Sequence, residues 1–483
     1  MSRDYDVIIL GSGPAGFACA MQSSKFGKRA LVIEANKKYL GGTWINTGTV
    51  PSKALREAAK TIYEFNRRFG DEKQKPYERF RMKDLLQYKN EILENENRRV
   101  KDNLIKNQVD TVRGFGRLLD EHTVEVEDHL GDTETYTGEY IMLSTGSIPK
   151  EPVNFEIDDD KIFDNQSILE LTHIPRRLVI AGAGVNAIEY ASTFAAMGTR
   201  VTILNDQEDY LTFLDDEIKE VLINIFKQQR ITIRNNVELE DVDFNPLRVC
   251  TEVCFHEIDH PDNPEVLEAE HVLYLGGRQP NTGQIGLEHT SVQLDDEQFI
   301  KVDKYYATHA KNIYAGGDVI GFPSLASASF SQGRLAACHM FSIPIEEEPS
   351  EIPFGIYSIP ELAHIGMTEQ EARKKEIDIT IGRAYFKNTT LADISHHHRG
   401  LLKLVFETNS LKLLGVHILG ERACEIIHTG QAVLAFNGDI RYFIQHVLNY
   451  PTYSEAYRNA AFNGINRVNK AGVKYQEILQ RDV

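Results

Sequence analysis

The 483-residue sequence contains few cysteines, a single tryptophan and a shortage of positive charge. Its five cysteines are scattered and odd in number, which favours a reducing compartment over a disulfide framework. The 71 acidic residues outnumber the 53 basic ones, and the net charge of −18 disfavours nucleic acid as a partner. No apolar run is long enough to cross a membrane, and residues 1–10 lack a secretion signal. We therefore expect a cytoplasmic protein without a membrane span.

The remaining composition is that of a globular protein, with 42% hydrophobic and 26% charged residues. At roughly 150 residues per domain, a chain of this length is expected to form two to four domains. Changes in pattern along the chain place boundaries near residues 150, 270 and 345. The expected units are therefore residues 1–150, 151–270, 271–345 and 346–483.

Two segments of the chain resemble each other, and the first spans residues 6–34. An apolar run leads into Gly11-x-Gly13-x-x-Gly16, a helical stretch follows, and a second apolar run ends at Glu34. This order predicts strand, glycine turn, helix and parallel strand. Such glycines allow a tight turn, a close approach to a pyrophosphate and close helix–strand packing, while a carboxylate at position 34 can bind an adenosine ribose. Spacing and context together predict a dinucleotide site.

The second segment, residues 177–205, repeats this pattern. An apolar run leads into Gly182-x-Gly184-x-x-Ala187, which has the alanine variant of the motif, and a second apolar run ends at Asn205. It predicts a second dinucleotide site on another Rossmann-like unit. Two such sites in one chain suggest a flavin that exchanges hydride with a nicotinamide coenzyme.

The residues around Asn205 leave the choice between NAD and NADP open. An amide at this position does not repel the 2′-phosphate of NADP as a carboxylate would, but residues 206–209 are mostly acidic. A basic residue such as Arg200 or Lys227 could bind the phosphate if the fold brings either one close. We expect both coenzymes to react, with NADH bound more tightly.

Other segments add to this plan. Residues 76–108 are polar with helical spacing and predict a solvent-exposed helix, whereas residues 123–143, 247–256 and 401–406 alternate as strands do. Residues 343–353 are rich in proline and glutamate and are interpreted as a linker. The run His396-His397-His398 lies in a polar stretch with no converging ligand visible, so we expect a surface loop and no metal site.

Several further segments make the whole chain resemble the pyridine nucleotide–disulfide oxidoreductases, in the expected order. These segments are residues 41–53 (GGTWINTGTVPSK), 143–147 (LSTGS), 277–282 (GRQPNT), 313–319 (IYAGGDV) and 450–455 (YPTYSE). The resemblance implies an α/β fold with two Rossmann-like dinucleotide-binding domains and a C-terminal α+β interface domain that forms a homodimer or higher homo-oligomer. It assigns residues 1–150 and 271–345 to an FAD-binding domain, residues 151–270 to an NAD(P)-binding domain and residues 346–483 to the interface.

The resemblance also implies FAD as the cofactor, with NAD and NADP as substrates. Together with the two glycine motifs, it gives the expected cofactor-binding residues: Gly11, Gly13, Gly16, Glu34, Gly42, Thr43, Thr49, Lys53, Thr145, Gly146, Gly182, Gly184, Ala187, Asn205, Gly277, Arg278, Gly317 and Asp318. By the same resemblance, Lys53 lies beside the flavin N5 atom and pairs with Glu189. These two residues are the expected catalytic residues, because a fixed cation stabilises negative charge on the flavin ring.

Three positions depart from the family pattern. Trp44 and Thr49 stand where disulfide-reducing members have cysteines, and Tyr450 stands where they have a histidine before the proline. A dithiol relay needs two sulfurs and a base that holds a proton near pH 7, which these three side chains cannot supply. We therefore expect no redox disulfide and a structural role for all five cysteines.

One branch of the family works without the disulfide, namely the soluble flavin-containing pyridine nucleotide transhydrogenases. Residues 49–56 (TVPSKALR) and the segment from Gly317 to Ala328 resemble that branch. The resemblance implies ping-pong hydride transfer between NAD(H) and NADP(H) through the flavin. One alternative is an NAD(P)H dehydrogenase that passes electrons to a quinone or another small acceptor. A second is a flavoprotein with a binding role and no activity.

Overall fold

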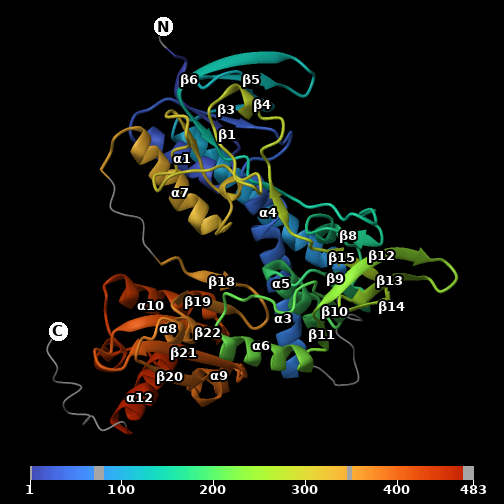
Figure 1. Cartoon of the computed structure of the whole chain (residues 1–483), viewed down its shortest axis with the longest axis vertical. Helices are drawn as coiled ribbons and strands as arrows, with labels where there is room; N and C mark the ends of the chain where they lie inside the picture. Colours follow the sequence, from blue (N-terminus) through green and yellow to red (C-terminus); the bar gives the residue numbers. More distant parts are fainter. Residues whose placement is uncertain (1–2, 70–80, 345–350, 471–483) are drawn as a thin grey trace.

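The computed structural model describes residues 3–69, 81–344 and 351–470. The first unit, uppermost in Figure 1, is built on a seven-stranded sheet. Its strands in spatial order are β3 (Asp110–Arg113), β2 (Ala30–Glu34), β1 (Tyr5–Leu10), β6 (Thr133–Leu143), β5 (Thr123–Glu127) and β4 (Phe115–Leu118), and β17 (Ile313–Ala315) also pairs with β6. The hairpin expected over residues 123–143 is the antiparallel pair β5–β6.

The first apolar run of the sequence becomes the central strand β1, which lies parallel to both β2 and β6. Val7 and Ile9 pack on one face with α1 (Pro14–Lys25) and α7 (Ala326–Met340), while Ile8 packs on the other face. Figure 1 shows α1 and α7 side by side. Because both faces of the strand are covered, its residues are apolar without alternation.

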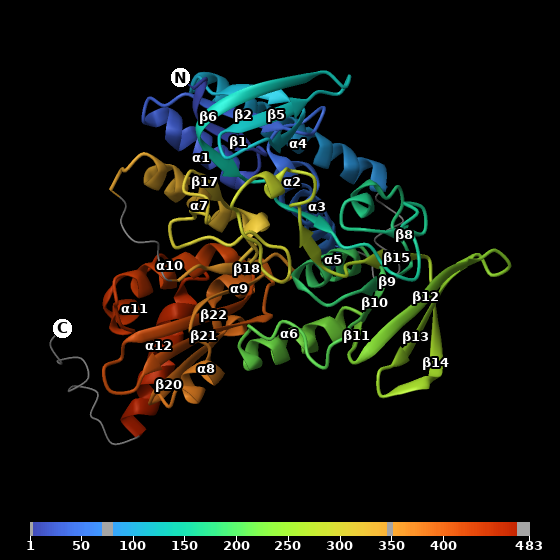
Figure 2. The same ribbon diagram turned by 45° about the horizontal axis from the view of Figure 1, so that its top comes forward.

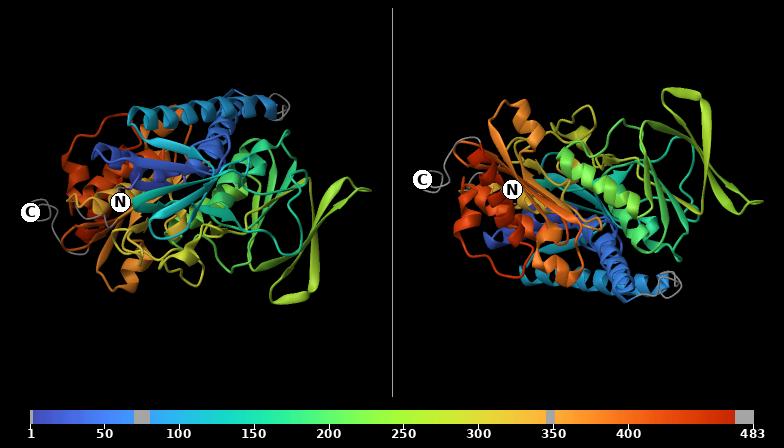
Figure 3. Two further views of the ribbon diagram at one scale, coloured as in Figure 1. Left: turned by 90° about the horizontal axis from the view of Figure 1, so that it is seen from above. Right: turned by 90° about the horizontal axis from the view of Figure 1, so that it is seen from below.

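Three further helices of this unit are α2 (Gly42–Asn46), α3 (Thr49–Phe69) and α4 (Met82–Lys106), and α4 lies along one edge of the molecule in Figure 3. The helix predicted over residues 76–108 exists from Met82 onward, and residues 76–80 lie outside the described part. The prediction that it is simply solvent-exposed is wrong. Lys89 is buried, donates to the Leu169 carbonyl at 2.9 Å and pairs with Glu170 at 2.5 Å.

The second unit repeats the parallel arrangement. Its five-stranded sheet has the order β11 (Ile231–Arg234), β10 (Arg200–Leu204), β9 (Arg177–Ala181), β15 (His271–Tyr274) and β8 (Ile162–Phe163). The helices are α5 (Val185–Ala196) and α6 (Asp216–Gln228), with the 3₁₀ turn η2 (Ser167–Glu170). Because β15 pairs with β9, this sheet runs a few residues past the boundary expected near 270.

Two small sheets complete the middle of the chain. An antiparallel sheet of β12 (Val237–Asn245), β13 (Cys250–Glu257) and β14 (His260–Ala269) projects from the second unit in Figure 2. The strand expected over residues 247–256 corresponds to β13. The short pair β7 (Ser147–Pro149) and β16 (Arg278–Pro280) lies where the chain leaves and re-enters the first unit, followed by the 3₁₀ turns η3 (Leu287–His289) and η4 (Asp318–Ile320).

The C-terminal unit is an α+β domain. Its sheet has the order β18 (Phe354–Ile356), β19 (Leu362–Gly366), β22 (Leu413–Gly420), β21 (Gly400–Glu407) and β20 (Ile379–Tyr385). The helices are α8 (Glu369–Lys374), α9 (Thr390–Ser395), α10 (Ala423–Ala435), α11 (Arg441–Gln445) and α12 (Glu455–Lys470), with the 3₁₀ turn η5 (Phe386–Asn388). The predicted fold class is thereby confirmed. Most of the linker expected over residues 343–353 lies outside the described part.

A group of buried charges joins this C-terminal sheet to the second unit. Lys403 of β21 lies 2.8 Å from Asp215, which caps α6, and 2.6 Å from Glu369 at the start of α8. Arg383 of β20 pairs with Glu217 of α6 at 2.6 Å. Burial by itself lowers the pKa of Lys403, but the carboxylates of Asp215 and Glu369 raise it above its usual value. The two units are therefore connected by paired charges as well as by apolar packing.

Candidate active site

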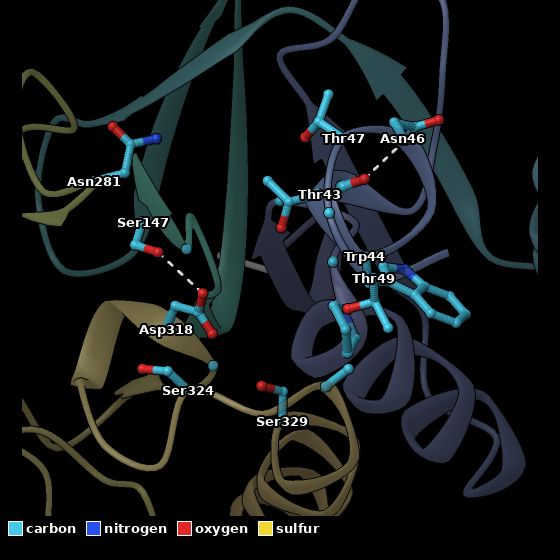
Figure 4. A pocket seen from close by; sticks show the side chains of 18 of the residues that line it. Thr43, Trp44, Asn46, Thr47, Thr49, Ser147, Asn281, Asp318, Ser324 and Ser329 are labelled. Atoms are coloured by element: carbon cyan, nitrogen blue, oxygen red, sulfur yellow. Dashed lines mark hydrogen bonds between the residues drawn. The ribbon is translucent and has the colours of Figure 1, made fainter. Parts of the chain in front are cut away.

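One cavity of about 410 Å³ lies where the loop after β1 meets the helices α2 and α3, the segment after β6 and the loop before α7. Figure 4 shows side chains from α2, α3, the segment after β6 and the loop before α7 around it. Its size falls in the range of small-molecule and cofactor sites. The expected cofactor-binding residues that line it are Gly11, Gly13, Glu34, Gly42, Thr43, Thr49, Lys53, Thr145, Gly146, Arg278, Gly317 and Asp318.

The first glycine motif forms the floor of this cavity. Gly11 has φ +97°, and a Cβ there would lie 2.4 Å from the Ser144 carbonyl oxygen, so only glycine fits this turn. Gly16 packs against the back of the same loop, where a Cβ would lie 2.0 Å from the Gly11 oxygen. Gly13 is the N-cap of α1, which has no side-chain cap, and the space where its Cβ would be is open. The uncapped helix start can therefore donate backbone N–H groups to a phosphate, which fits a dinucleotide.

Glu34 lies at the end of β2 beside that loop. One carboxylate oxygen accepts from the Ser12 backbone N–H at 3.1 Å and also from its hydroxyl, and the other accepts from the Asn36 N–H at 2.9 Å. The side chain is buried yet lines the cavity. It is therefore held rigidly where a ribose hydroxyl can reach it.

A short hydrogen-bonded chain forms the opposite wall. Arg278 donates from Nε to the Ser147 hydroxyl oxygen at 2.8 Å. That hydroxyl donates to Asp318 at 2.9 Å, and Figure 4 shows this second bond. Burial lowers the pKa of Arg278, although Asp318 opposes the shift. Thr145 donates to the Asn281 carbonyl at 2.7 Å and fixes the neighbouring turn. Ser147 and Asn281 were not among the residues expected from the sequence, although each lies inside a segment that carried the family resemblance.

Lys53 and Glu189, which lie far apart in the sequence, form an ion pair of 2.6 Å. Lys53 follows Thr49 by four residues on α3, so both face the cavity from one side of the helix. The second carboxylate oxygen of Glu189 accepts from the Tyr357 backbone N–H at 2.8 Å, and the Tyr357 ring lies 5.2 Å from Lys53 Nζ. Burial raises the pKa of the Tyr357 phenol to about 12, so it stays protonated at neutral pH. Sequence reasoning missed Tyr357 at this site because its role depends on the distant Glu189.

Trp44 and Thr49 line the cavity in place of a cysteine pair. The Trp44 ring packs edge-on against Phe330, with ring centroids 5.0 Å apart, and its Nε1 has no hydrogen-bond partner among the described residues. All five cysteines of the chain are free thiols, and none lines this cavity. Tyr450 is exposed, and its hydroxyl lies 2.7 Å from that of Thr390.

The second glycine motif lies at the carboxyl edge of the other parallel sheet, and its Gly182, Gly184 and Ala187 do not line this cavity. Gly182 repeats the geometry of Gly11, because a Cβ there would lie 2.4 Å from the Leu275 carbonyl oxygen. Gly184 is the N-cap of α5 and has open space in front of it, while Ala187 is buried behind. Gly277 lies beyond β15 and precedes β16. From α5, Asn186 and Tyr190 reach the cavity, so the two glycine motifs lie on either side of it.

The side chain of Asn205 points toward the loop that follows it and bonds to that loop. Its amide nitrogen donates to the carbonyls of Gln207 at 2.9 Å and Asp209 at 3.3 Å and to the Asn235 side chain at 3.0 Å. The side chain therefore shapes the loop, and its N–H groups are already engaged. Neither basic residue suggested by the sequence is close to it. Arg200 begins β10 and Lys227 lies in the last turn of α6, which leads to the start of β11, so both are at the opposite edge of the sheet.

The expectation for the three consecutive histidines is wrong in one respect. His396 and His398 are exposed, but His397 is half-buried, with Nε2 lying 3.2 Å from Glu64 and Nδ1 3.6 Å from Glu421. These carboxylates come from α3 and from the turn before α10, which is why no converging ligand was visible in the sequence. Lys60 already pairs with Glu421 at 2.5 Å and lies 3.7 Å from Glu64.

Two adjoining strand–glycine–helix units, a lysine–glutamate pair between them and an attached α+β domain are the architecture of an oxidoreductase that uses a flavin and a nicotinamide nucleotide. Residues 5–333 match the family description "Pyridine nucleotide-disulphide oxidoreductase", and residues 352–461 match its dimerisation domain. The chain therefore belongs to the pyridine nucleotide-disulphide oxidoreductase family. In the described part of the chain, no helix combines the length and the hydropathy that a bilayer crossing requires.

Full-length relatives narrow the comparison. The chain is 39% identical to a soluble pyridine nucleotide transhydrogenase of Marinomonas sp., over 97% of this chain and 99% of the relative. It is 37% identical to one of Pseudomonas aeruginosa, over 96% of this chain and 99% of the relative. Among solved structures, it is similar to a HOCl-induced flavoprotein disulfide reductase of Escherichia coli, with 25% identity, a TM-score of 0.84 and coverage of 95% of this chain and 99% of the other.

Proposed function

We propose that this chain is a flavin-dependent pyridine nucleotide transhydrogenase that transfers hydride between NAD(H) and NADP(H). The observation that carries the proposal is the composition of the cavity wall. Trp44 and Thr49 occupy it without a cysteine, while Lys53 and Glu189 remain paired beside it. A site without sulfur can pass electrons from one nicotinamide to another but cannot reduce a disulfide by thiol exchange. The full-length relatives named as soluble transhydrogenases support the same assignment.

We infer that the flavin is FAD. The uncapped start of α1 and the buried Glu34 lie at one part of the cavity, as a pyrophosphate and an adenosine ribose require. Asp318, held by Ser147, faces the same space and can accept from ribityl hydroxyls. When bound, the flavin supplies the redox chemistry, because its ring takes up hydride from one nicotinamide and releases it to another.

Lys53 and Glu189 supply the electrostatics. The ammonium group of Lys53 is oriented by Glu189, whose carboxylate is itself held by the Tyr357 N–H. A cation that is already positioned costs no reorganisation when negative charge develops beside it. Lys53 therefore favours uptake of hydride in the cavity. Glu189 holds the Lys53 ammonium group in place and limits its movement.

The second unit is proposed to hold either nicotinamide coenzyme in turn. The start of α5, with Gly184 as its N-cap and no side-chain cap, can bind the pyrophosphate, and the acidic loop after Asn205 contacts the adenosine end. One coenzyme must leave before the other enters, which makes the reaction ping-pong. We also propose that the domains meet near residues 150, 270 and 345. The proposal includes a homodimer and a cytoplasmic location.

The proposal is tested by titrating the purified flavoprotein without oxygen. Addition of NADH should bleach the flavin absorbance, and subsequent NADP⁺ should restore it with formation of NADPH. Reduction by NADH that only a quinone, and not NADP⁺, can reverse would assign the chain to the NAD(P)H dehydrogenases. A flavin that neither NADH nor NADPH reduces would leave a binding role, and a colourless protein from flavin-replete cells would contradict the proposed cofactor.

A further inference from the structure

We infer that His173, Glu270 and His271 form a binding site for a zinc-class divalent cation on the second unit. The three residues come from two connections that the sequence separates by about a hundred positions. His173 lies between η2 and β9, Glu270 lies between β14 and β15, and His271 begins β15. One ligand atom from each of the three lies within 4.8 Å of the other two.

The distances suit a metal ion. His271 Nε2 lies 3.0 Å from His173 Nε2, which lies 3.1 Å from a Glu270 carboxylate oxygen. Zinc binds imidazole nitrogen and carboxylate oxygen at about 2.0–2.2 Å with tetrahedral angles, so its ligand atoms are separated by about 3.3 Å. Two of the three spacings are therefore close to this value, and the third, between His271 and Glu270, lies within 4.8 Å.

Hydrogen bonding alone does not satisfy the three atoms. If His173 Nε2 carries the hydrogen, this single N–H must serve both Glu270 and His271. If His271 Nε2 carries it instead, the lone pair of His173 faces the Glu270 carboxylate at 3.1 Å. A divalent cation accepts all three lone pairs at once.

The ligands are also held in place. The second oxygen of Glu270 accepts from the Arg176 backbone N–H at 2.7 Å. The His271 ring is buried and packs edge-on against Phe163, with centroids 5.3 Å apart. Such support around metal ligands fixes their orientation before the ion arrives. His173 and Glu270 are half-exposed, with side-chain accessibilities of 50% and 38%, so the ion can enter from solvent and keep a water as fourth ligand.

Lys161, whose charge reaches His271, pairs with Asp160 at 3.5 Å and not with Glu270. Within the part of the chain that the structure describes, Glu270 makes no ion pair with a lysine or an arginine, whereas neighbouring Arg177 pairs with Glu268 at 3.3 Å. The cluster of Glu64, His397 and Glu421 differs in this respect, because Lys60 already supplies its positive charge. Two imidazole nitrogens and one carboxylate also match the donor preference of zinc-class ions rather than that of Mg²⁺ or Ca²⁺.

The site lies at the amino end of β15, whereas Gly182 contacts Leu275 beyond the carboxyl end of that strand. It is therefore at the opposite edge of the sheet from the dinucleotide motif. The ion would not touch a coenzyme there. Its role is to join the connection before β9 to the connection between β14 and β15.

The test is calorimetric titration of the untagged, metal-free flavoprotein with ZnCl2, in parallel with four variants. We expect one Zn²⁺ per chain, with affinity reduced at least roughly tenfold in His173→Ala and in Glu270→Gln, which keeps the acceptor for Arg176. His289→Ala is the matched control, because that side chain is 53% exposed and also lies beside a glutamate, at 3.7 Å. The His289→Ala and His397→Ala variants should both bind Zn²⁺ with the affinity of the original chain.

Copper provides a second readout that does not depend on affinity. The electron paramagnetic resonance spectrum with one equivalent of Cu²⁺ should show coupling to two imidazole nitrogens in the original chain and to one in His173→Ala. Absence of Zn²⁺ binding, unchanged binding in His173→Ala, or loss of binding only in His397→Ala would overturn the assignment.

Discussion

Glu189 holds Lys53 with one carboxylate oxygen at 2.6 Å and the Tyr357 backbone N–H with the other at 2.8 Å. Helix α3 of the first unit, α5 of the second and the segment after β18 therefore meet at a single carboxylate. The position of the cation at the cavity depends on all three units being assembled.

Replacing Lys53 by methionine removes the cation but keeps most of the side-chain volume. We expect flavin reduction by NADH to slow by roughly 10- to 100-fold, because a preorganised charge is lost where charge develops. Rapid mixing without oxygen measures this rate. Lys53→Arg retains the charge and should lose less, and an unchanged rate in Lys53→Met would show that the lysine has no part in the reaction.

Trp44 is the only tryptophan in the chain and lines the cavity, so its fluorescence reports flavin binding. We expect emission to be quenched in the flavoprotein and to rise when the flavin is removed, since a nearby flavin accepts energy from an indole. Emission spectra before and after flavin release test this. Trp44→Phe provides the blank, and equal emission with and without flavin would place the cofactor away from Trp44.

Thiol reagents should leave the reaction intact. Burial raises the pKa of Cys19 to about 12, and burial also raises the pKa of Cys424, so neither becomes a thiolate near neutral pH. We expect full NADH-dependent activity after iodoacetamide or arsenite, measured beside a disulfide-reducing enzyme that these reagents inactivate. Inactivation of this chain by arsenite would reveal a cysteine pair in catalysis.

Coenzyme preference should follow the charge of the loop after Asn205. Lys219 pairs with Asp209 at 2.5 Å, and Arg234 pairs with Glu265 at 2.6 Å, so both cations are engaged. We expect NADH to bind more tightly than NADPH, and the difference to shrink as salt screens the loop. Gln207→Arg should improve NADPH binding about tenfold or more through one charge-assisted bond. Steady-state kinetics with both coenzymes measure this, with Gln207→Ala as control, and tighter NADPH binding at low salt in the original chain would contradict it.

His364 should make the protein sensitive to acid. Burial lowers its pKa from 6.5 to about 4, and neither ring nitrogen has a hydrogen-bond partner among the described residues. The unfolded chain binds more protons between these values, so stability is present above pH 6.5 and is lost as the pH falls toward 4. For His364 alone, the free energy of unfolding falls by at most roughly 3 kcal/mol.

Substitution of His364 by phenylalanine tests this pH dependence. The ring shape is kept among Phe213, Phe354 and His417, while the titrating group is removed. We expect a higher melting temperature at pH 5 and a flatter dependence on pH than in the original chain. His129→Phe, at an exposed position, serves as control. An identical pH profile in His364→Phe would assign the acid sensitivity to other groups.

Local features of the fold could be predicted from the sequence because they depend on neighbouring residues. Both strand–glycine–helix units follow from apolar runs and glycine spacing within about thirty positions. The surroundings of Asn205 and His397 could not be predicted, because they depend on Asn235 and on the distant Glu64 and Glu421. Only the folded chain shows that the N–H groups of Asn205 are engaged.

The buried charges around Lys403 limit how the protein can move. Separating α6 from the C-terminal sheet would break the Lys403–Asp215 and Arg383–Glu217 pairs together and would expose the apolar residues that these units bury against each other. A hinge between these two units is therefore costly to open. We therefore expect the exchange of one nicotinamide coenzyme for another to be governed by loops and side chains around the cavity and not by domain motion.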